Sequence, residues 1–388
     1  CALPISNARS LIIDTALAVG GEVSIATTGT GSDLTIVGTP NLSGPTTNLS
    51  LSASGNLTAS SDVNVPGNVS LISTGGCISI PTSAVRARGG RLDAVAETGL
   101  TLGTSVTAST LNLATNTGGI LVETQNSVAG GPVTFANATA NSGDVTIAAR
   151  SGNIVITDRV STGSGNLSVR SYTSLVNLTS TANLSAPSGT ASVIAATSVV
   201  ADANASLNAA TLNYSAQSTS SLLTDPDIAF RNLRARITGS GNPLTVNTAG
   251  PLNVTGINTV NGDADITVTG GDLTINGAVA LGTGGLKLST PAGGINASST
   301  INATTLNTAS QNSATFANAV VSSVTGTVAS AGQNFTLTSP QAFAVGTGNI
   351  VANGGTISLT ALAGNLARAG ELRSGGGTVA LNVGSNFI

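Results

Sequence analysis

The chain has 388 residues, of which 7% are charged and 2% aromatic, with 48 glycines, no histidine and a formal net charge of −3. This is not an average globular composition, yet a mean hydropathy of +0.32 argues against disorder, which requires low hydrophobicity and high net charge. Without histidine, imidazole metal ligands and Ser/His nucleophile pairs are excluded.

The beginning of the chain bears on its location. Residue 1 is Cys and the sequence contains no Met, which predicts a processed chain or a fragment, most simply one from which a signal peptide has been removed. Cys1 and Cys77 are the two cysteines. Export would permit a disulfide between them, within the chain or to a neighbouring subunit, while two inert thiols or a lipid-modified Cys1 are the alternatives.

The rest of the chain is built by repetition. Segment 143–163 aligns without a gap on 262–282, with three glycines at the same positions in both copies. Near the C-terminus, 354–359 returns as 376–381. A fixed period in the twenties with short alternating apolar runs is typical of a β-solenoid, in which each coil buries its inward face only against its neighbours.

The sequence therefore predicts an all-β protein, a single β-solenoid over 1–388 with coils of about 22 residues, roughly 17 or 18 turns and a distinct N-terminal start in 1–40. A narrow core suits Val, Ile, Leu and Ala, which explains the scarcity of aromatics. Period-2 alternation predicts strands with these buried inward positions: Val145, Ile147, Ile154, Ile156, Ile266, Leu273, Ile275, Ile357 and Leu359.

Two charged, non-repetitive segments near 80–97 and 224–237 are predicted as irregular excursions that contact partners, with solvated loops as the alternative. The candidate contacts are Arg86, Arg88, Arg91, Asp225, Asp227, Arg231, Arg234 and Arg236. A sequence pI near 4.8 and the lack of interleaved aromatics argue against nucleic acid. No run of 18 or more apolar residues occurs, so no transmembrane segment is predicted.

Little in the sequence supports catalysis or metal binding. Asp225 and Asp227 are the best carboxylate pair for polysaccharide cleavage, but a turn or ion pairs with nearby arginines are the favoured interpretation. Asp263 and Asp265 are similar to a calcium turn, although the nonapeptide calcium repeat is absent. We therefore expect no enzyme, no cofactor and no metal.

Many Asn-X-Ser/Thr triplets occur, for example at Asn48, Asn68 and Asn166. They would be glycan acceptors on an extracellular surface. The favoured alternative is that Asn suits turns and stacked amide ladders, so that a chain rich in Asn, Ser and Thr generates such triplets by chance.

The recurrent Gly-Asp/Asn-Leu/Val/Ile-Thr/Ser-Ile/Val phrases, at Gly143, Gly152, Gly165, Gly262 and Gly271, resemble the repeats of filamentous-haemagglutinin-like exoproteins and autotransporter passengers of Gram-negative bacteria. The resemblance implies a single right-handed parallel β-helix, secretion across the outer membrane and adhesive or structural roles. Segment 39–42 (Thr-Pro-Asn-Leu) matches the Asn-Pro-Asn-Leu turn of the two-partner secretion domain only in part, because its first residue is Thr.

Two main function classes follow, both extracellular or at the cell surface. The first is a structural protein that self-associates end to end into a filament, sheath or surface layer, because solenoid ends expose unpaired strand edges. Its contact would join Thr378, Val379 and Leu381 to residues near Leu11 to Ile25 of the next copy. The second is an adhesin that binds cell-surface glycans or proteins. A carbohydrate-active enzyme is a distant third.

Overall fold

The computed structural model describes residues 3–14, 18–19, 21–42, 47–124, 132–218, 223 and 228–388. The regular structure in these ranges is β-strand, arranged as a parallel β-solenoid of about 16 turns with coils about 22 residues apart and no helix. The chain divides into two compact units, Cys1–Ala209 and Ala210–Ile388.

The first unit consists of short strands whose inward and outward residues alternate. They are β1 (Leu3–Asn7), β2 (Leu11–Ile13), β3 (Ala18–Val19), β4 (Val23–Thr27), β5 (Leu34–Ile36), β6 (Asn41–Leu42), β7 (Leu49–Ala53), β8 (Leu57–Ala59), β9 (Val63–Val65), β10 (Val69–Ser73), β11 (Cys77–Ile80), β12 (Val85–Ala87), β13 (Arg91–Ala96), β14 (Gly99–Thr107), β15 (Thr110–Thr115), β16 (Ile120–Thr124), β17 (Val133–Ala140), β18 (Val145–Ala149), β19 (Ile154–Thr162), β20 (Leu167–Ser171), β21 (Val176–Leu178), β22 (Asn183–Ala195) and β23 (Val199–Ala201).

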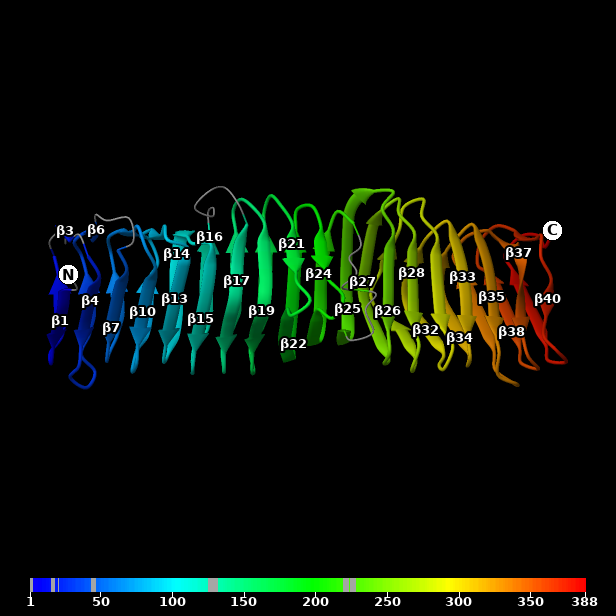
Figure 1. Cartoon of the computed structure of the whole chain (residues 1–388). Coiled ribbons are helices and arrows are strands. Elements are labelled where there is room, and N and C mark those ends of the chain that lie inside the picture. The colour runs from blue at the N-terminus through cyan, green and yellow to red at the C-terminus, as the bar shows by residue number, and fades with distance from the viewer. Residues whose placement is uncertain are drawn as a thin grey trace. The chain divides into compact units, whose positions relative to one another are not determined.

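Parallel ladders stack the coils of this unit. At its N-terminal end each coil contributes three strands, since β4 pairs with β7, β5 with β8 and β6 with β9, all in parallel. Figure 1 shows the strands of successive coils lying side by side. Further along, Val145 pairs with Leu167 in the next coil, 22 residues later.

The second unit continues the same pattern after β24 (Ser206–Ala216), which begins before the division between the units. Its strands are β25 (Ile228–Ser240), β26 (Leu244–Thr248), β27 (Leu252–Val260), β28 (Ala264–Val268), β29 (Leu273–Ile275), β30 (Val279–Ala280), β31 (Leu286–Thr290), β32 (Ile295–Asn302), β33 (Thr305–Ser310), β34 (Ala314–Val320), β35 (Ser323–Val328), β36 (Phe335–Ser339), β37 (Phe343–Ala352), β38 (Ile357–Ala361), β39 (Leu366–Arg368), β40 (Leu372–Arg373) and β41 (Val379–Val383).

The predicted inward positions are buried. All nine of the residues named from the alternation have an exposed fraction of 0%. Ile357 pairs with Val379, which confirms the alignment of 354–359 with 376–381 near the C-terminus. Because apolar side chains stack on their counterparts one coil away, each coil covers the core of the next.

A ladder of Asn and Asp side chains joins successive coils at the turns before the strands. Asp144 Oδ1 accepts the backbone N–H of Asn166 at 2.7 Å, and Asn166 Oδ1 accepts that of Thr190 at 2.9 Å. Asp263 occupies the position that matches Asp144 and accepts the N–H of Gly285 at 2.7 Å. The turns therefore use Asx oxygens to satisfy backbone donors one coil on, which explains the abundance of Asn.

Glycines allow the coils to approach closely at the same corners. A Cβ atom placed on Gly355 would overlap the carbonyl group of Gln333, and one on Gly377 would overlap that of Gly355. These glycines belong to the echo between 354–359 and 376–381. The Gly-Gly pairs are thus a requirement of coil stacking, because any larger residue would push the coils apart.

The structure corrects the predicted excursion at 80–97. This segment contains the end of β11 followed by β12 and β13, and β13 pairs in register with β10 and β15. Its charged residues lie outward while Leu92, Ala94 and Ala96 are buried. The segment has the ordinary alternation of a strand, with charged residues at its outward positions. Likewise, 228–237 belongs to β25, whereas 224–227 lies outside the described residues.

The start of the chain also joins the array. Ile5 of β1 pairs with Ile25 of β4, so the predicted distinct start in 1–40 is an ordinary coil where it is described. The number of turns, about 16, is slightly below the roughly 17 or 18 expected, and coil length varies along the chain. The step from Val23 to its partner Leu49 is longer than the step from Leu306 to its partner Val324.

Candidate functional site

The C-terminal strand β41 forms an edge that exposes core residues. Val379 and Leu381 stack in register on Ile357 and Leu359, both fully buried, yet are themselves 40% and 37% exposed. The Thr378 carbonyl accepts the N–H of Ile357 at 2.9 Å. Among the described strands, only β38 pairs with β41, so its other edge carries unpaired backbone groups.

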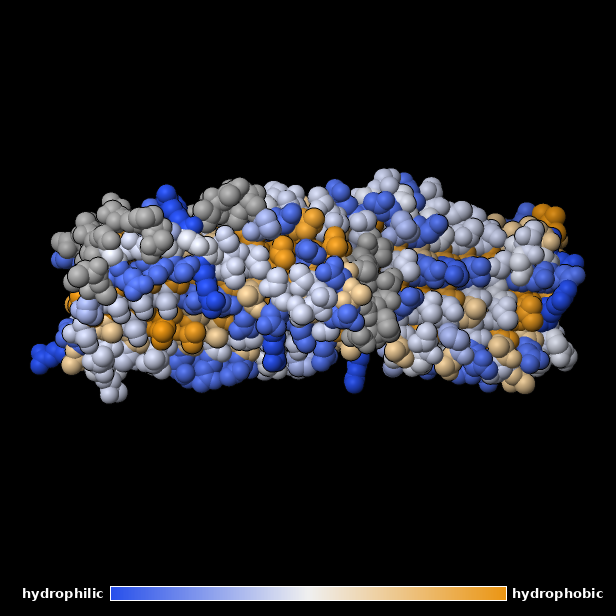
Figure 2. Space-filling model, in the orientation of Figure 1, coloured by the Kyte–Doolittle hydropathy of each residue, from blue (hydrophilic) through white to orange (hydrophobic). Residues whose placement is uncertain are grey.

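Hydrophobic side chains surround this edge. Phe387 and Ile388 are 51% and 69% exposed, and Phe387 bridges Leu366 of β39. Figure 2 shows orange surface beside the C-terminus that Figure 1 marks. Among the described residues, no further coil covers the core side chains at this edge.

The N-terminal edge has the same character. Ile5 and the β2 residues Leu11 and Ile13 are half-exposed, although the residues they pair with are buried, and Ile12 is 65% exposed. Within the predicted contact range of Leu11 to Ile25, β2 and β3 lie at this edge. Only Val23 to Ile25 needs correction, because β4 lies between β1 and β7 and its Ile25 is buried. The strands at this edge are β1, β2 and β3, which pair with β4, β5 and β6.

The structure separates the three arginines near residue 90. Arg86 of β12 pairs with Asp62 at 2.9 Å, and Arg91 of β13 pairs with Asp93 at 2.8 Å. Arg88 is exposed, and its side chain makes no ion pair within the described part of the chain. Two of these three guanidiniums already have partners inside the molecule, so they do not form one cationic patch.

The Asp62 carboxylate has a lowered pKa. The N–H of Ala84 donates to its Oδ1 at 2.9 Å, and the Arg86 guanidinium donates to its Oδ2. Both hydrogen bonds favour the ionised form, the Ala84 contribution being the larger, and hold the pKa below the ordinary 3.8.

We expect Arg86→Gln to raise the pKa of Asp62 part of the way towards 3.8, because the hydrogen bond from Ala84 remains. Since the folded-state pKa is lowered, the stabilisation is present above pH 3.8 and is lost as the pH falls through the lowered pKa. An NMR titration of the Asp62 carboxyl carbon measures this. Arg88→Gln is the control and leaves the titration unchanged; an unaltered Asp62 midpoint in Arg86→Gln would contradict the assignment.

The second arginine group lies on β25, and the structure brings two of its members together. Arg234 and Arg236 project outward from the same face, with buried Ala235 between them, and border a hollow of about 400 Å³. Arg231 precedes the register shift in β25 and does not line this hollow. Asp225 and Asp227 lie outside the described residues, so their proposed roles remain untested.

The other candidates have structural partners. Asp265 pairs with Lys287 at 2.8 Å while Asp263 belongs to the Asx ladder. No group of three or more acidic or Cys side chains suited to a metal occurs within the described residues. Cys77 carries a free thiol, and its N–H donates to Asn56 Oδ1 at 3.0 Å. Cys1 lies outside the described residues, so the disulfide stays a prediction.

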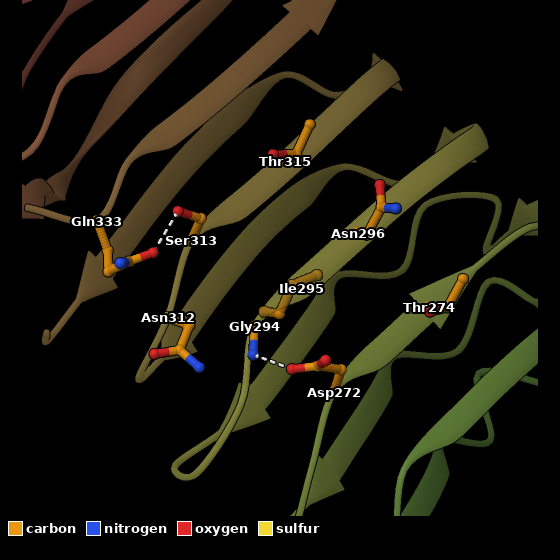
Figure 3. Close-up of a pocket in the computed structure, with 9 residues that line it drawn as sticks. All are labelled: Asp272, Thr274, Gly294, Ile295, Asn296, Asn312, Ser313, Thr315 and Gln333. Carbon is orange, nitrogen blue, oxygen red and sulfur yellow. Dashed lines mark hydrogen bonds between the residues drawn. The ribbon is translucent and has the colours of Figure 1, made fainter.

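A polar groove runs across four coils of the second unit (Figure 3). It encloses about 550 Å³. Asp272 Oδ1 accepts the N–H of Gly294 at 2.7 Å, and Ser313 donates to Gln333 Oε1 at 2.8 Å. The side-chain amides of Asn296 and Asn312 make no hydrogen bond within the described part of the chain. The groove thus offers free donors and acceptors to a neutral polar ligand.

Sequence reasoning missed this groove. Its outward row contains Thr274, Asn296 and Thr315, which pair in register across β29, β32 and β34. The sequence does not reveal which residues lie side by side in successive coils. These three residues are unequally spaced along the chain and carry no charge, so no pattern marks them as neighbours. Sequence reasoning also did not predict an exposed aromatic at Tyr172. The Arg170 guanidinium lies over its ring, 4.2 Å from the ring centre.

Within the described ranges, no helix has the length and apolar character needed to cross a membrane. Comparison with models of known families, with curated proteins and with solved structures yields no match for this chain.

Proposed function

We propose that this protein is an extracellular structural protein whose copies add end to end into a filament, sheath or surface layer. The observation that carries the proposal is the exposed core at β41, where Val379 and Leu381 occupy inward positions without a covering coil. Covering them with another strand would remove apolar surface from water and pair the backbone groups of the open edge.

The proposed contact joins β41 of one copy to β1 and β2 of the next. The two edges differ, so the contact is heterologous, and repeating it generates an open polymer rather than a closed dimer. Segment 376–383 contains no charged residue and no proline, which are the usual obstacles to strand pairing. The resemblance to filamentous exoproteins supports secretion and a fibrous role.

We expect Leu381→Lys to raise the concentration at which the protein associates by at least about tenfold. An unpaired ammonium buried in the contact costs more than the ~1.4 kcal/mol that a factor of ten represents. Static light scattering over a concentration series measures the onset, and circular dichroism checks the fold. Val379→Pro removes a backbone donor, so we expect it to raise the concentration of association as well.

Leu362→Lys is the matched control, because Leu362 is 63% exposed near the same end but lies beyond β38, outside the inward stack. It should associate like the parent. If Leu381→Lys and Val379→Pro also associate like the parent, end-to-end addition through β41 is wrong.

A second candidate function, adhesion, is favoured by the polar groove of Figure 3. Unsatisfied amides at Asn296 and Asn312 suit the hydroxyl groups of a cell-surface glycan. In this alternative the protein stays monomeric and binds cells through its lateral surface. Cell binding that is lost in Asn296→Ala/Asn312→Ala, without any association in light scattering, would favour adhesion over assembly.

A further inference from the structure

We propose that the hollow beside Arg234 and Arg236 binds an acidic oligosaccharide that carries carboxylate groups. This site is distinct from the strand edges and does not rest on end-to-end assembly. It lies on β25, β27 and β30 of the second unit.

The two arginines are cations without counter-charges. Arg234 and Arg236 are exposed, and neither makes an ion pair or side-chain hydrogen bond within the described part of the chain. Four of the other arginines are paired with carboxylates instead, namely Arg86, Arg91, Arg150 and Arg373. Two unpaired guanidiniums on one face form a local positive site on a chain whose net charge is −3.

The register places these side chains next to small residues. Arg234 lies opposite Gly256, and Arg236 lies opposite Asn258, which in turn pairs with Ala280. The Arg234 stem passes close to Gly256, with its Cγ 3.9 Å from where a Cβ would lie. Ala278 is exposed in the same hollow. Gly and Ala leave room for a ligand to lie flat against the sheet.

The two guanidiniums and the neighbouring amide together favour one class of ligand. A guanidinium fork matches a carboxylate through two parallel hydrogen bonds. Residues two apart along a strand are separated by about 6.6 Å, so the pair suits successive anionic groups on a polymer. The Asn258 amide makes no hydrogen bond within the described residues and is available to sugar hydroxyls. No aromatic side chain lines the hollow, which disfavours the base stacking that single-stranded nucleic acids use.

The test measures binding of a fluorescently labelled hexasaccharide of uronic acids by anisotropy, at protein concentrations below the onset of association. We expect the double variant Arg234→Gln/Arg236→Gln to weaken binding at least about tenfold. Ala278→Glu should do the same, because its carboxylate would fill the hollow and pair with the guanidiniums. Circular dichroism confirms that both variants are folded.

The matched control is Arg159→Gln/Arg368→Gln, which removes two exposed, unpaired arginines elsewhere and changes the net charge equally. It should bind within about twofold of the parent. If the control and the site variant weakened hexasaccharide binding equally, the loss would be explained by net charge alone, and the proposal would be wrong. The proposal would also be wrong if the parent protein bound a neutral hexasaccharide equally well. Tighter binding of a single-stranded oligonucleotide of equal charge would contradict it too.

Discussion

Ile156→Asp is expected to lower the free energy of unfolding of the first unit by about 3 to 5 kcal/mol, because the carboxylate would be buried without a partner. Ile156 is fully buried and pairs with Phe135 on one side and Leu178 on the other, both also fully buried. Urea unfolding followed by circular dichroism measures the change.

Val155→Asp is the control for this prediction. Val155 is adjacent in sequence but points outward and pairs with Thr134 and Asn177, whose polar side chains accommodate a carboxylate. It should change stability by less than about 1 kcal/mol. If Ile156→Asp unfolds at the same urea concentration as the parent, the assignment of inward positions is wrong.

Gly355→Ala is expected to destabilise the second unit by about 2 to 3 kcal/mol, since its Cβ overlaps the backbone of Gln333 in the preceding coil and the two coils must separate. A rigid backbone carbonyl cannot rotate away as a side chain would. Thermal and urea unfolding measure the loss.

Gly250→Ala supplies the matched comparison, because a Cβ at Gly250 meets no atom within 4 Å. Its effect should stay within about 0.5 kcal/mol, with a small gain expected from the reduced entropy of the unfolded chain. Equal stabilities for the two alanine variants would show that close coil contact is not the reason for glycine at 355.

The fold was predictable because its signal is local. Alternating apolar residues identified inward positions such as Ile266 and Leu273, and a short echo indicated the coil length. Each coil repeats the same packing problem, so one correctly assigned strand indicates the pattern of the next. The charged strands β13 and β25 were harder, because charges at their outward positions interrupted the repeated composition without interrupting the alternation.

The candidate surfaces depend on register, which the sequence does not reveal. Arg236 lies beside Asn258, and Thr274 lies beside Asn296, only because particular coils have particular lengths. Coil lengths vary with the turns, as the long step from Val23 to Leu49 shows. Leu381 is exposed because no described strand stacks on β41, and the sequence does not show this. Its apolar character, by contrast, is evident from the sequence alone.

Electron microscopy combined with fibre diffraction of the purified protein tests the central proposal most directly. We predict that raising the concentration produces filaments that lengthen by end-to-end addition. The strand spacing of about 4.8 Å, which each copy already has between its coils, should continue along the filament axis across each junction. Filaments should be absent from Leu381→Lys at the same concentration. Isolated particles of constant length at every concentration would contradict assembly through the open strand edges.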